Sequence, residues 1–269
     1  MGPGARTAVI DDISYLTRSE HRVSALVAMT DRPRSRSELA EMTGVSSSTI
    51  RRTLREFEDR RWIRKLDYKY ETTHLGSHVA AAMDDVLDRF ELERSIRDVW
   101  DILPDEGSGF TIDMCADAVV TVADADDPYR PVSRLVELMD RTDRFRFVGF
   151  EVAMLEPCKD ALCERILAGM NAEIINPPRV ANYIRSSCTD LFEETLESGN
   201  LTVRLHDDLP SYGVSIFDDR IAVSGYDADH LTVRALVDTD APAAREWAES
   251  MYRRYRRETP IVPVGPPEE

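Results

Sequence analysis

The sequence is poor in lysine, in cysteine and in long apolar runs. Only three of its thirty-four basic residues are lysine, and the others are arginine. Four cysteines in 269 residues are too few for the disulfide framework of a small secreted domain. No apolar run approaches the ~20 residues that a transmembrane helix needs. The first residues lack the pattern of a signal peptide, so we expect a cytoplasmic protein with no membrane partner.

The net charge of −16 is divided unequally along the chain. Residues 1–78 contain fourteen basic and eleven acidic residues, a net of about +3, so the remaining residues carry about −19. This asymmetry indicates two domains, of which the first has the local positive charge that a phosphate backbone attracts. Aspartate exceeds glutamate by 28 to 22. With the arginine excess, this composition favours a halophilic archaeon over an acidic, GC-rich bacterial source.

Three helices in succession are predicted near the N-terminus, the first at residues 19–30. Ser35 and Glu38 have the spacing of a capping box, which starts the second helix, and Gly44 can end it. Ser46 then has the position of an N-cap for the third helix. The short, polar connection between the second and third helices is the turn that a helix-turn-helix requires.

The third helix has one apolar and one polar face. Ile50, Leu54 and Phe57 repeat at helical spacing, and residues 62–72 follow as a β-hairpin. The order of these elements is that of a winged helix-turn-helix, whose polar helix face enters the DNA major groove. The alternative is an ordinary pair of core helices. We predict DNA contacts from Ser35, Arg36, Ser46, Ser47, Ser48, Thr49, Arg51, Arg52 and Arg55, and from Lys65, Tyr68 and Lys69 of the hairpin.

A long helix is predicted after the hairpin, from a cap at Thr73 to about Ile102. Apolar residues between Val79 and Phe90 recur at spacings of four, three and four. The stripe either forms a dimer interface or packs against the helix's own domain. We favour dimerisation, because two DNA half-sites need a symmetric contact. We assign residues 1–74 to the DNA-binding domain and residues 75–103 to this linker helix.

Short apolar strands and amphipathic helices alternate in residues 110–258. We predict strands at 118–122, 145–150, 173–175, 201–205, 212–217, 220–226 and 231–237, and helices at 131–141, 157–169, 182–196 and 242–257. The pattern is typical of an α/β sandwich with a mixed sheet. The fold class is therefore α/β overall, with an N-terminal winged helix-turn-helix, a C-terminal effector or dimerisation domain and a flexible tail at 259–269.

Six segments together carry a resemblance to a known family. They are FEDRRWI (Phe57–Ile63), THLGSHVA (Thr73–Ala80), ADAVVT (Ala116–Thr121), PVSRLVELM (Pro131–Met139), SYGVSIFDDRIAVSGYD (Ser211–Asp227) and VDTDAPAAREWAESMYRRYRRE (Val237–Glu258). The chain resembles haloarchaeal winged-helix regulators whose C-terminal part is the methanogenesis-regulator (filament regulator type) middle domain. The resemblance implies a transcription regulator with a phospholipase-D-like sensor domain and no particular ligand.

Motifs of catalysis are absent from the sequence. None of the five histidines has a lysine two residues later, as the nucleophile pair of a phospholipase-like site requires. No G-x-S-x-G elbow, P-loop or H-E-x-x-H motif occurs either. We therefore predict no catalytic residue, no cofactor and no metal site.

The cysteines distinguish this chain from the family pattern, in which most members have few or none. All four lie in the predicted C-terminal domain: Cys115, Cys158, Cys163 and Cys188. Three roles are open for them: small buried hydrophobic residues, a thiol redox switch, or metal ligands. A disulfide from Cys158 or Cys163 to Cys115 or Cys188 fits better than one between Cys158 and Cys163, which face apart on one helix.

A ligand pocket of the C-terminal domain is expected at the ends of its strands. The polar and aromatic residues assigned there are Glu151, Asn176, Arg179, Tyr183, Tyr212, Ser215 and Asp227. Taken together, the sequence predicts a homodimeric, sequence-specific DNA-binding transcription regulator that senses a small molecule or a redox signal. Its predicted partners are double-stranded DNA, a second copy of the chain and a small-molecule effector. The alternatives are a thiol-redox or metal-responsive regulator and, less favoured, an enzyme with a DNA-binding appendage.

Overall fold

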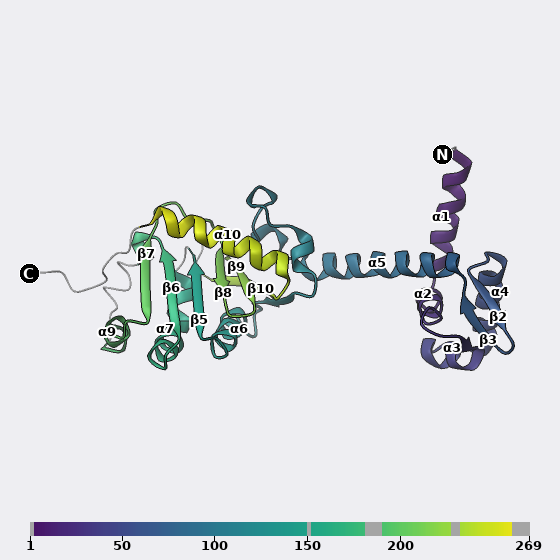
Figure 1. Ribbon diagram of the computed structural model, residues 1–269, viewed down its shortest axis with the longest axis horizontal. Coiled ribbons are helices and arrows are strands. Elements are labelled where there is room, and N and C mark those ends of the chain that lie inside the picture. The colour runs from purple at the N-terminus through teal and green to yellow at the C-terminus, as the bar shows by residue number, and fades with distance from the viewer. Residues whose placement is uncertain (1–2, 150–151, 181–189, 227–231, 260–269) are drawn as a thin grey trace, which may run out of the picture. The chain divides into compact units, whose positions relative to one another are not determined.

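The computed structural model describes residues 3–149, 152–180, 190–226 and 232–259. The chain divides into two compact units, Met1–Glu91 and Leu92–Glu269, each with its own hydrophobic core (Figure 1). Within the described residues, none of the helices has both the length and the apolar character required to span a membrane.

The N-terminal unit is a winged helix-turn-helix with an additional helix in front of it. Its elements are α1 (Pro3–Thr17), α2 (Glu20–Val27), β1 (Arg34–Ser35), α3 (Arg36–Thr43), α4 (Ser47–Asp59), β2 (Ile63–Leu66), β3 (Lys69–Thr72) and most of α5 (His74–Ile96). The three strands form an antiparallel sheet in the order β1-β3-β2. The helix predicted at 19–30 is the shorter α2, and neither α1 nor β1 was predicted.

The core of this unit confirms the apolar face predicted for the third helix. Ile50 and Phe57 of α4 are fully buried, together with Leu26 of α2 and Leu39 of α3. Phe57 also packs against Trp62, which joins α4 to the wing, with ring centroids 5.8 Å apart. Burial of a large apolar side chain contributes about 1.5–3 kcal/mol, so this cluster fixes the orientation of α4 on the other helices.

Helix α5 ends at Ile96, and not near Ile102 as predicted from its stripe. Beyond it, Val99 and Leu103 are buried in the core of the C-terminal unit. A short 3-10 turn, η1 (Trp100–Ile102), carries the chain between them. The apolar residues beyond Ile96 therefore recur because they are buried in the C-terminal core, and not because the helix continues.

The C-terminal unit contains a seven-stranded mixed sheet, which confirms the predicted fold class. After the turns η2 (Glu106–Ser108) and η3 (Ile112–Cys115), its elements are β4 (Val119–Val122), α6 (Arg130–Met139), β5 (Arg144–Val148), α7 (Val152–Leu167), β6 (Asn171–Asn176), α9 (Asp190–Glu197), β7 (Leu201–Leu205), β8 (Gly213–Ile216), β9 (Ile221–Tyr226), β10 (Val233–Thr239) and α10 (Pro242–Glu258). The strand order is β4-β10-β9-β8-β5-β6-β7. Strands β5, β6 and β7 are parallel, and the other pairs are antiparallel.

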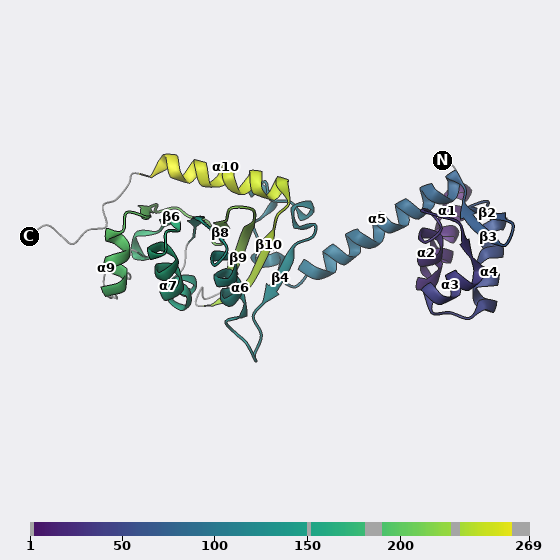
Figure 2. The same cartoon turned by 60° about the horizontal axis from the view of Figure 1, so that its bottom comes forward.

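Helices cover both faces of this sheet. Figure 2 shows α10 along one face and α6, α7 and α9 on the other. Side chains alternate accordingly: Phe145 and Phe147 of β5 pack towards α6 and α7, whereas Val148 packs towards α10. The unit is therefore a three-layer α/β/α sandwich, built on the two-residue period of its strands.

One buried ionic cluster links the α6 layer to the sheet. Asp238 of β10 is fully buried and accepts hydrogen bonds from Arg134 at 3.0 and 3.1 Å and from Arg220 at 2.9 Å. A buried carboxylate requires such partners, since an unpaired charge in the interior is strongly destabilising. Asp240, two residues along, is exposed and pairs with Arg220 only at 3.5 Å.

Candidate nucleic-acid interface

Helices α3 and α4 begin with the caps that the sequence predicts. The Ser35 hydroxyl accepts from the Glu38 backbone N–H at 3.3 Å, and the Glu38 carboxylate accepts from the Ser35 backbone N–H at 2.8 Å. This backbone hydrogen bond lowers the pKa of Glu38 to about 2. Gly44 ends α3 in the left-handed conformation, and the Ser46 hydroxyl accepts from the Thr49 N–H at 3.3 Å. These contacts fix the turn between the two helices.

The recognition helix α4 buries one face and exposes the other. Ile50, Thr53, Leu54 and Phe57 are buried. On the opposite face, five of the predicted DNA-contacting side chains are exposed: Ser47, Ser48, Arg51, Arg52 and Arg55. Thr49 is half-buried. The exposed face is short, polar and cationic, as a surface that reads base edges needs to be.

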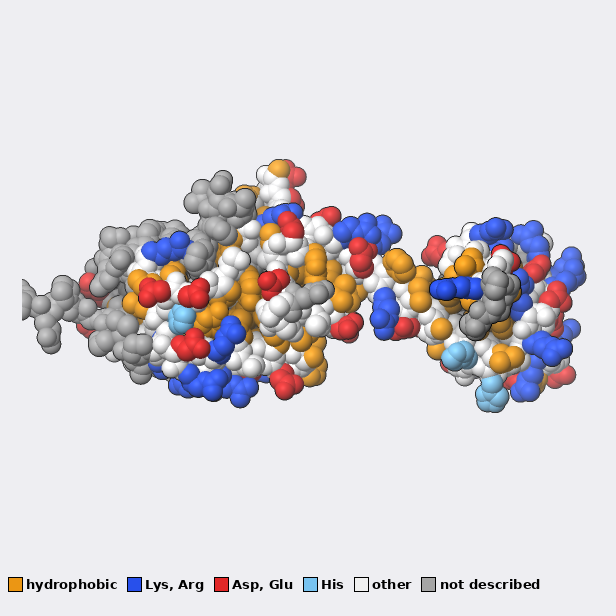
Figure 3. Space-filling model, turned by 90° about the horizontal axis from the view of Figure 1, so that it is seen from above, with side chains coloured by type: hydrophobic (Ala, Val, Ile, Leu, Met, Phe, Trp, Pro, Cys, Tyr) orange, Lys and Arg blue, Asp and Glu red, His pale blue; other side chains and the backbone are white. Residues whose placement is uncertain are grey.

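The cations of the N-terminal unit fall into two groups. The first group is paired with acids of the same unit: Arg32 with Glu38 at 3.1 Å, Arg34 with Asp31 at 3.2 Å, Arg60 with Asp12 and Glu56 at 2.9 Å, and Arg64 with Glu71 at 2.5 Å. The second group makes no ion pair with any described residue and includes every predicted DNA-contacting cation, namely Arg36, Arg51, Arg52, Arg55, Lys65 and Lys69. Figure 3 shows Lys and Arg side chains at the surface of this unit.

The wing places its tip in solvent. Leu66 pairs with Lys69 across a two-residue turn at Asp67 and Tyr68, so Lys69 belongs to β3. Asp67 has a φ of 53°, a left-handed conformation that aspartate tolerates in tight turns. Tyr68 is 74% exposed, and Lys65 is exposed beside it. The wing thus presents an exposed aromatic ring at its tip and one lysine on each of its two strands.

Two of the predicted contact residues already have a structural role. The Ser46 hydroxyl lies 2.9 Å from that of Ser48 and 3.0 Å from that of Thr49, in addition to capping α4. Ser35 is likewise part of the capping box, and its neighbour Arg36 is exposed. A helix N-terminus attracts anions through its unpaired N–H groups and its dipole. Ser46 and Ser47 therefore lie where a phosphate would be stabilised.

Sequence reasoning missed the residues that support this surface. His21 of α2 lies with its Nε2 3.1 Å from the Thr53 hydroxyl, on the buried side of α4. Burial lowers the pKa of His21, and the charges of Arg22 and Arg52 lower it further. Arg61, between α4 and the wing, is exposed with a φ of 59° and was not among the predicted contacts. No local sequence motif marks His21 or Arg61, because the position of each depends on tertiary packing.

The predicted ligand-binding residues of the C-terminal unit do not all lie at strand ends. Asn176 does end β6 and is nearly buried, and Arg179 follows it at the surface. Ser215, however, lies inside β8, fully buried between Phe147 and Ala222 on the α6 and α7 side. Tyr212 contacts Trp247 of α10 on the opposite side. Three further predicted residues lie outside the described residues: Glu151, Tyr183 and Asp227.

The described cysteines are core residues. Cys115, Cys158 and Cys163 are all at most 4% exposed, and Cys188 lies outside the described residues. Burial raises the pKa of Cys115 to about 11 and that of Cys158 to about 12, so both are thiols at neutral pH. Cys115 packs on the α10 side of the sheet and Cys158 on the α7 side. The sheet therefore separates the two, which corrects the expectation of a disulfide between them.

No metal centre is formed by the described residues. Within the ranges given above, the structure brings together no group of three or more His, Cys, Asp or Glu side chains that could hold a metal ion. A role for Cys158 or Cys115 as metal ligands would also require their deprotonation, which their raised pKa values oppose.

Comparisons with known proteins match each unit to a known domain family. Residues 10–95 match the HVO_A0261 N-terminal domain, and residues 128–258 match the middle domain of the methanogenesis regulatory protein FilR1. No curated protein matches the chain.

Three solved structures illustrate the looser similarities. TrmBL2, an archaeal chromatin protein whose structure shows a novel mode of DNA binding, is 13% identical with a TM-score of 0.44, over 90% of this chain and 92% of its own. Phosphatidylserine synthase from Haemophilus influenzae Rd KW20 is 15% identical with a TM-score of 0.40, over 54% and 39%. An O-methyltransferase family protein from Burkholderia thailandensis is 11% identical with a TM-score of 0.24, over 74% and 64%. Similarities at this level establish no shared function.

The two family matches leave unassigned only the ends of the chain and the segment between residues 95 and 128. They occur in the order that the resemblance of the six sequence segments predicts. The chain therefore carries an HVO_A0261 N-terminal domain followed by the middle domain of the methanogenesis regulatory protein FilR1.

Proposed function

We propose that this regulator binds double-stranded DNA sequence-specifically, as a homodimer, through α4 and the β2–β3 wing. The observation that supports DNA binding most strongly is the distribution of ion pairs in the N-terminal unit. Acids neutralise Arg32, Arg34, Arg60 and Arg64, whereas the arginines of the exposed α4 face have no acidic partner among the described residues. A surface of unpaired cations is complementary to a phosphate backbone and to guanine edges.

The exposed face of α4 has the chemistry of direct readout. Arg51 and Arg52 can each donate two parallel hydrogen bonds to guanine, and Ser47 can bond to any base edge. Lys65 and Lys69 of the wing would contact the backbone, which positions the protein without reading sequence. In molar salt the Debye length is only ~3 Å. Close hydrogen bonds from α4 would then contribute more to affinity than long-range attraction.

Exposed apolar side chains support the homodimer. On α5, Val86, Leu87 and Phe90 lie at helical spacing and are exposed, and Phe90 is 63% exposed; Figure 3 shows hydrophobic side chains at the surface of this helix. On α1, the residues from Val9 to Ile13 include three further exposed aliphatic side chains. Contiguous exposed apolar surface is a mark of an interaction site. A second copy is the partner that a two-fold DNA site requires.

The C-terminal unit would supply the signal. A ligand that binds one arrangement of the two protomers better than another changes the spacing of the recognition helices, and with it the affinity for DNA. Thiol oxidation is a poorer candidate for this signal, because Cys115 and Cys158 are buried and protonated at neutral pH.

The test of specificity is a genome-wide map of bound sites, obtained by cross-linking and immunoprecipitation. The proposal expects a recurring sequence with two related half-sites whose centres are ~10 bp, or a multiple, apart. The doubly substituted Arg51→Ala, Arg52→Ala protein should lose that enrichment. Arg89→Ala, which removes an exposed arginine paired with Asp85 on α5, is the matched control and should retain it. Binding without any recurring sequence would contradict specific recognition.

A further inference from the structure

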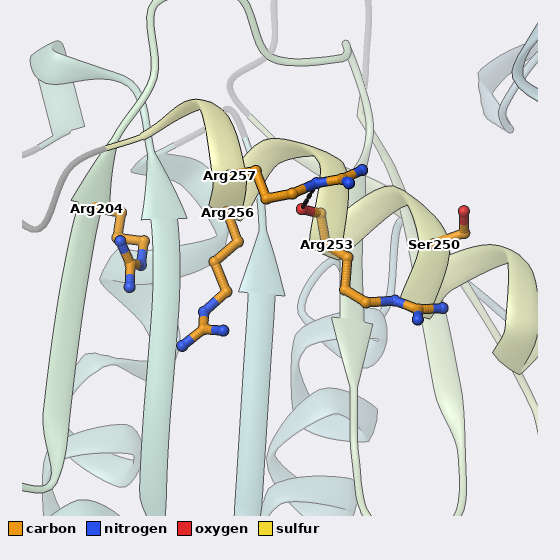
Figure 4. Close-up of a pocket in the computed structure, with 5 residues that line it drawn as sticks. All are labelled: Arg204, Ser250, Arg253, Arg256 and Arg257. Carbon is orange, nitrogen blue, oxygen red and sulfur yellow. Dashed lines mark hydrogen bonds between the residues drawn. The ribbon is translucent and has the colours of Figure 1, made fainter.

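Five polar side chains line an open cavity beside α10 in the C-terminal unit. Its volume is about 700 Å³, and its described lining is Arg204, Ser250, Arg253, Arg256 and Arg257. Figure 4 shows Arg204 projecting from β7 and the other four from α10, with Arg256 directed towards the sheet. A volume of this size is in the range of small-molecule sites, ~300–1,000 Å³. The lining is charged and not apolar, so the surface would recognise charge.

Two of these arginines are anchored by one carboxylate. Glu173 of β6 accepts from Arg204 Nε at 2.6 Å and from Arg256 Nε at 2.9 Å. Arg204 also donates to the Thr259 carbonyl at 3.0 Å and is only 8% exposed. Burial would raise the pKa of Glu173, but the hydrogen bonds from the two arginines outweigh it and lower the pKa. Glu173 therefore stays ionised and holds both guanidinium groups in place.

The other two arginines of the lining have no acidic partner in the part of the chain that the structure describes. Arg253 Nε donates to the Glu249 carbonyl at 3.1 Å, and Arg257 Nε donates to the Arg253 carbonyl at 3.2 Å. These bonds orient the side chains along α10, and both are exposed. Neither side chain forms an ion pair with any described residue. Arg253 and Arg257 lie at positions i and i+4, where like charges destabilise a helix.

The charge of the cavity is opposite to that of its surroundings. Four arginines against Glu173 leave about three positive charges, although residues 79–269 together carry about −19. The dipole at the C-terminal end of α10 favours a cation in the last turn. It does not account for Arg204, which comes from β7, or for Arg253, which lies more than a turn before the end. A bound anion would relieve the repulsion among all four.

We propose that the cavity formed by α10 and β7 binds a small anion that contains more than one phosphate group. Guanidinium groups match phosphate oxygens through paired hydrogen bonds, and Ser250 adds a hydroxyl donor. Arg204 is nearly buried, which favours a compact anion over a rigid duplex backbone as the ligand of this lining. This inference rests on the proposed function, because the anion would be the signal that the C-terminal unit senses.

Isothermal titration with pyrophosphate, at constant pH and KCl concentration, tests the site in the full chain without DNA. The wild-type protein should bind one pyrophosphate per chain, and Arg253→Gln with Arg257→Gln should weaken binding at least tenfold. Arg254→Gln is the control: the same helix loses one positive charge, but Arg254 is outside the lining and lies over the Tyr255 ring, 4.9 Å from its centroid. Its affinity should stay within twofold of wild type. Equal losses in both variants, or no wild-type binding, would overturn the proposal.

A second measurement separates this site from DNA binding. The Arg51→Ala, Arg52→Ala protein should bind pyrophosphate normally, so a failure of DNA recognition leaves this result intact. The affinity for an operator duplex is then measured without pyrophosphate. If Arg253→Gln with Arg257→Gln reduces this affinity as much as the α4 variant does, the cavity is a DNA contact and the small-anion proposal is wrong.

Discussion

A β-carbon on residue 76 would lie 1.8 Å from the carbonyl oxygen of Trp62. Gly76, in the first turn of α5, therefore permits a contact that no other residue allows. The same junction is closed by Thr73, whose N–H donates to the Trp62 carbonyl at 2.8 Å and whose hydroxyl donates to the Arg61 carbonyl at 2.7 Å. Because Trp62 also packs on Phe57 of α4, this contact links the recognition helix, the wing and α5.

The Gly76→Ala substitution should destabilise the N-terminal unit by about 3 kcal/mol, at the upper end of the cost of overpacking. The clash is with backbone, which cannot rotate away as a side chain would. Chemical unfolding followed by tryptophan fluorescence measures the loss. Gly107→Ala is the control: the added carbon would lie 3.3 Å from the Asp105 side chain, which can move. An unchanged midpoint for Gly76→Ala would contradict the close contact.

The pH dependence of stability should report His21. Its folded pKa is below the ordinary value, so the unfolded chain binds its proton more readily. The contribution of His21 to stability is therefore complete above about pH 6.5 and is lost as the pH falls through the folded pKa. Thermal unfolding between pH 8 and pH 5 should show this loss in the wild type and a smaller one in His21→Gln. Identical pH profiles would refute the role of the His21–Thr53 contact.

Asp238→Asn should destabilise the C-terminal unit by about 3–5 kcal/mol, the cost of breaking a buried ion pair. The substitution leaves Arg134 and Arg220 without the carboxylate that joins them inside the fold. Asp240→Asn removes the same charge from an exposed neighbour of Arg220 and should change stability by less than about 1 kcal/mol. Urea unfolding compares the two. Similar effects from both variants would show that the buried position of Asp238 does not matter.

Phe90→Asp should convert the proposed dimer to a monomer, because it places a charge in the exposed apolar stripe of α5. Sedimentation velocity at micromolar concentration measures the change in mass. Tyr129→Asp makes a similar replacement at a 61% exposed aromatic residue of the C-terminal unit and should leave the dimer intact. A wild-type protein that sediments as a monomer, or a Phe90→Asp protein that remains dimeric, would exclude this face of α5 as the dimer interface.

Local signals in the sequence were sufficient for the elements of the DNA-binding surface. The capping box at Ser35 and Glu38, the end of α3 at Gly44 and the apolar face of α4 are set by neighbours within four residues, and the structure has each of them. Strand β7 likewise has the predicted bounds, 201–205, because its composition and flanking residues define it.

Features that depend on distant residues could not be predicted in the same way. Strand β1 consists of two residues that are defined by pairing with β3. Helix α1 was missed because its aliphatic residues near Ile10 are exposed, so no core-facing pattern marks it. The pairing of Arg60 with Asp12 spans 48 positions, and it decides which arginines remain available to an anion. The anion cavity combines β7 with α10, which are separated by more than thirty residues.

We expect the unpaired arginines of α4 to bind DNA and the paired arginines of the N-terminal unit not to. Fluorescence anisotropy with an operator duplex, over a range of KCl concentrations, tests this most directly. Arg51→Ala with Arg52→Ala should weaken specific binding by about 2–6 kcal/mol, since each base contact contributes about 1–3 kcal/mol. Arg32→Ala with Arg64→Ala removes two charges that are already paired with acids and should weaken binding much less. Undiminished affinity in the first variant, or an equal loss in the second, would contradict the account.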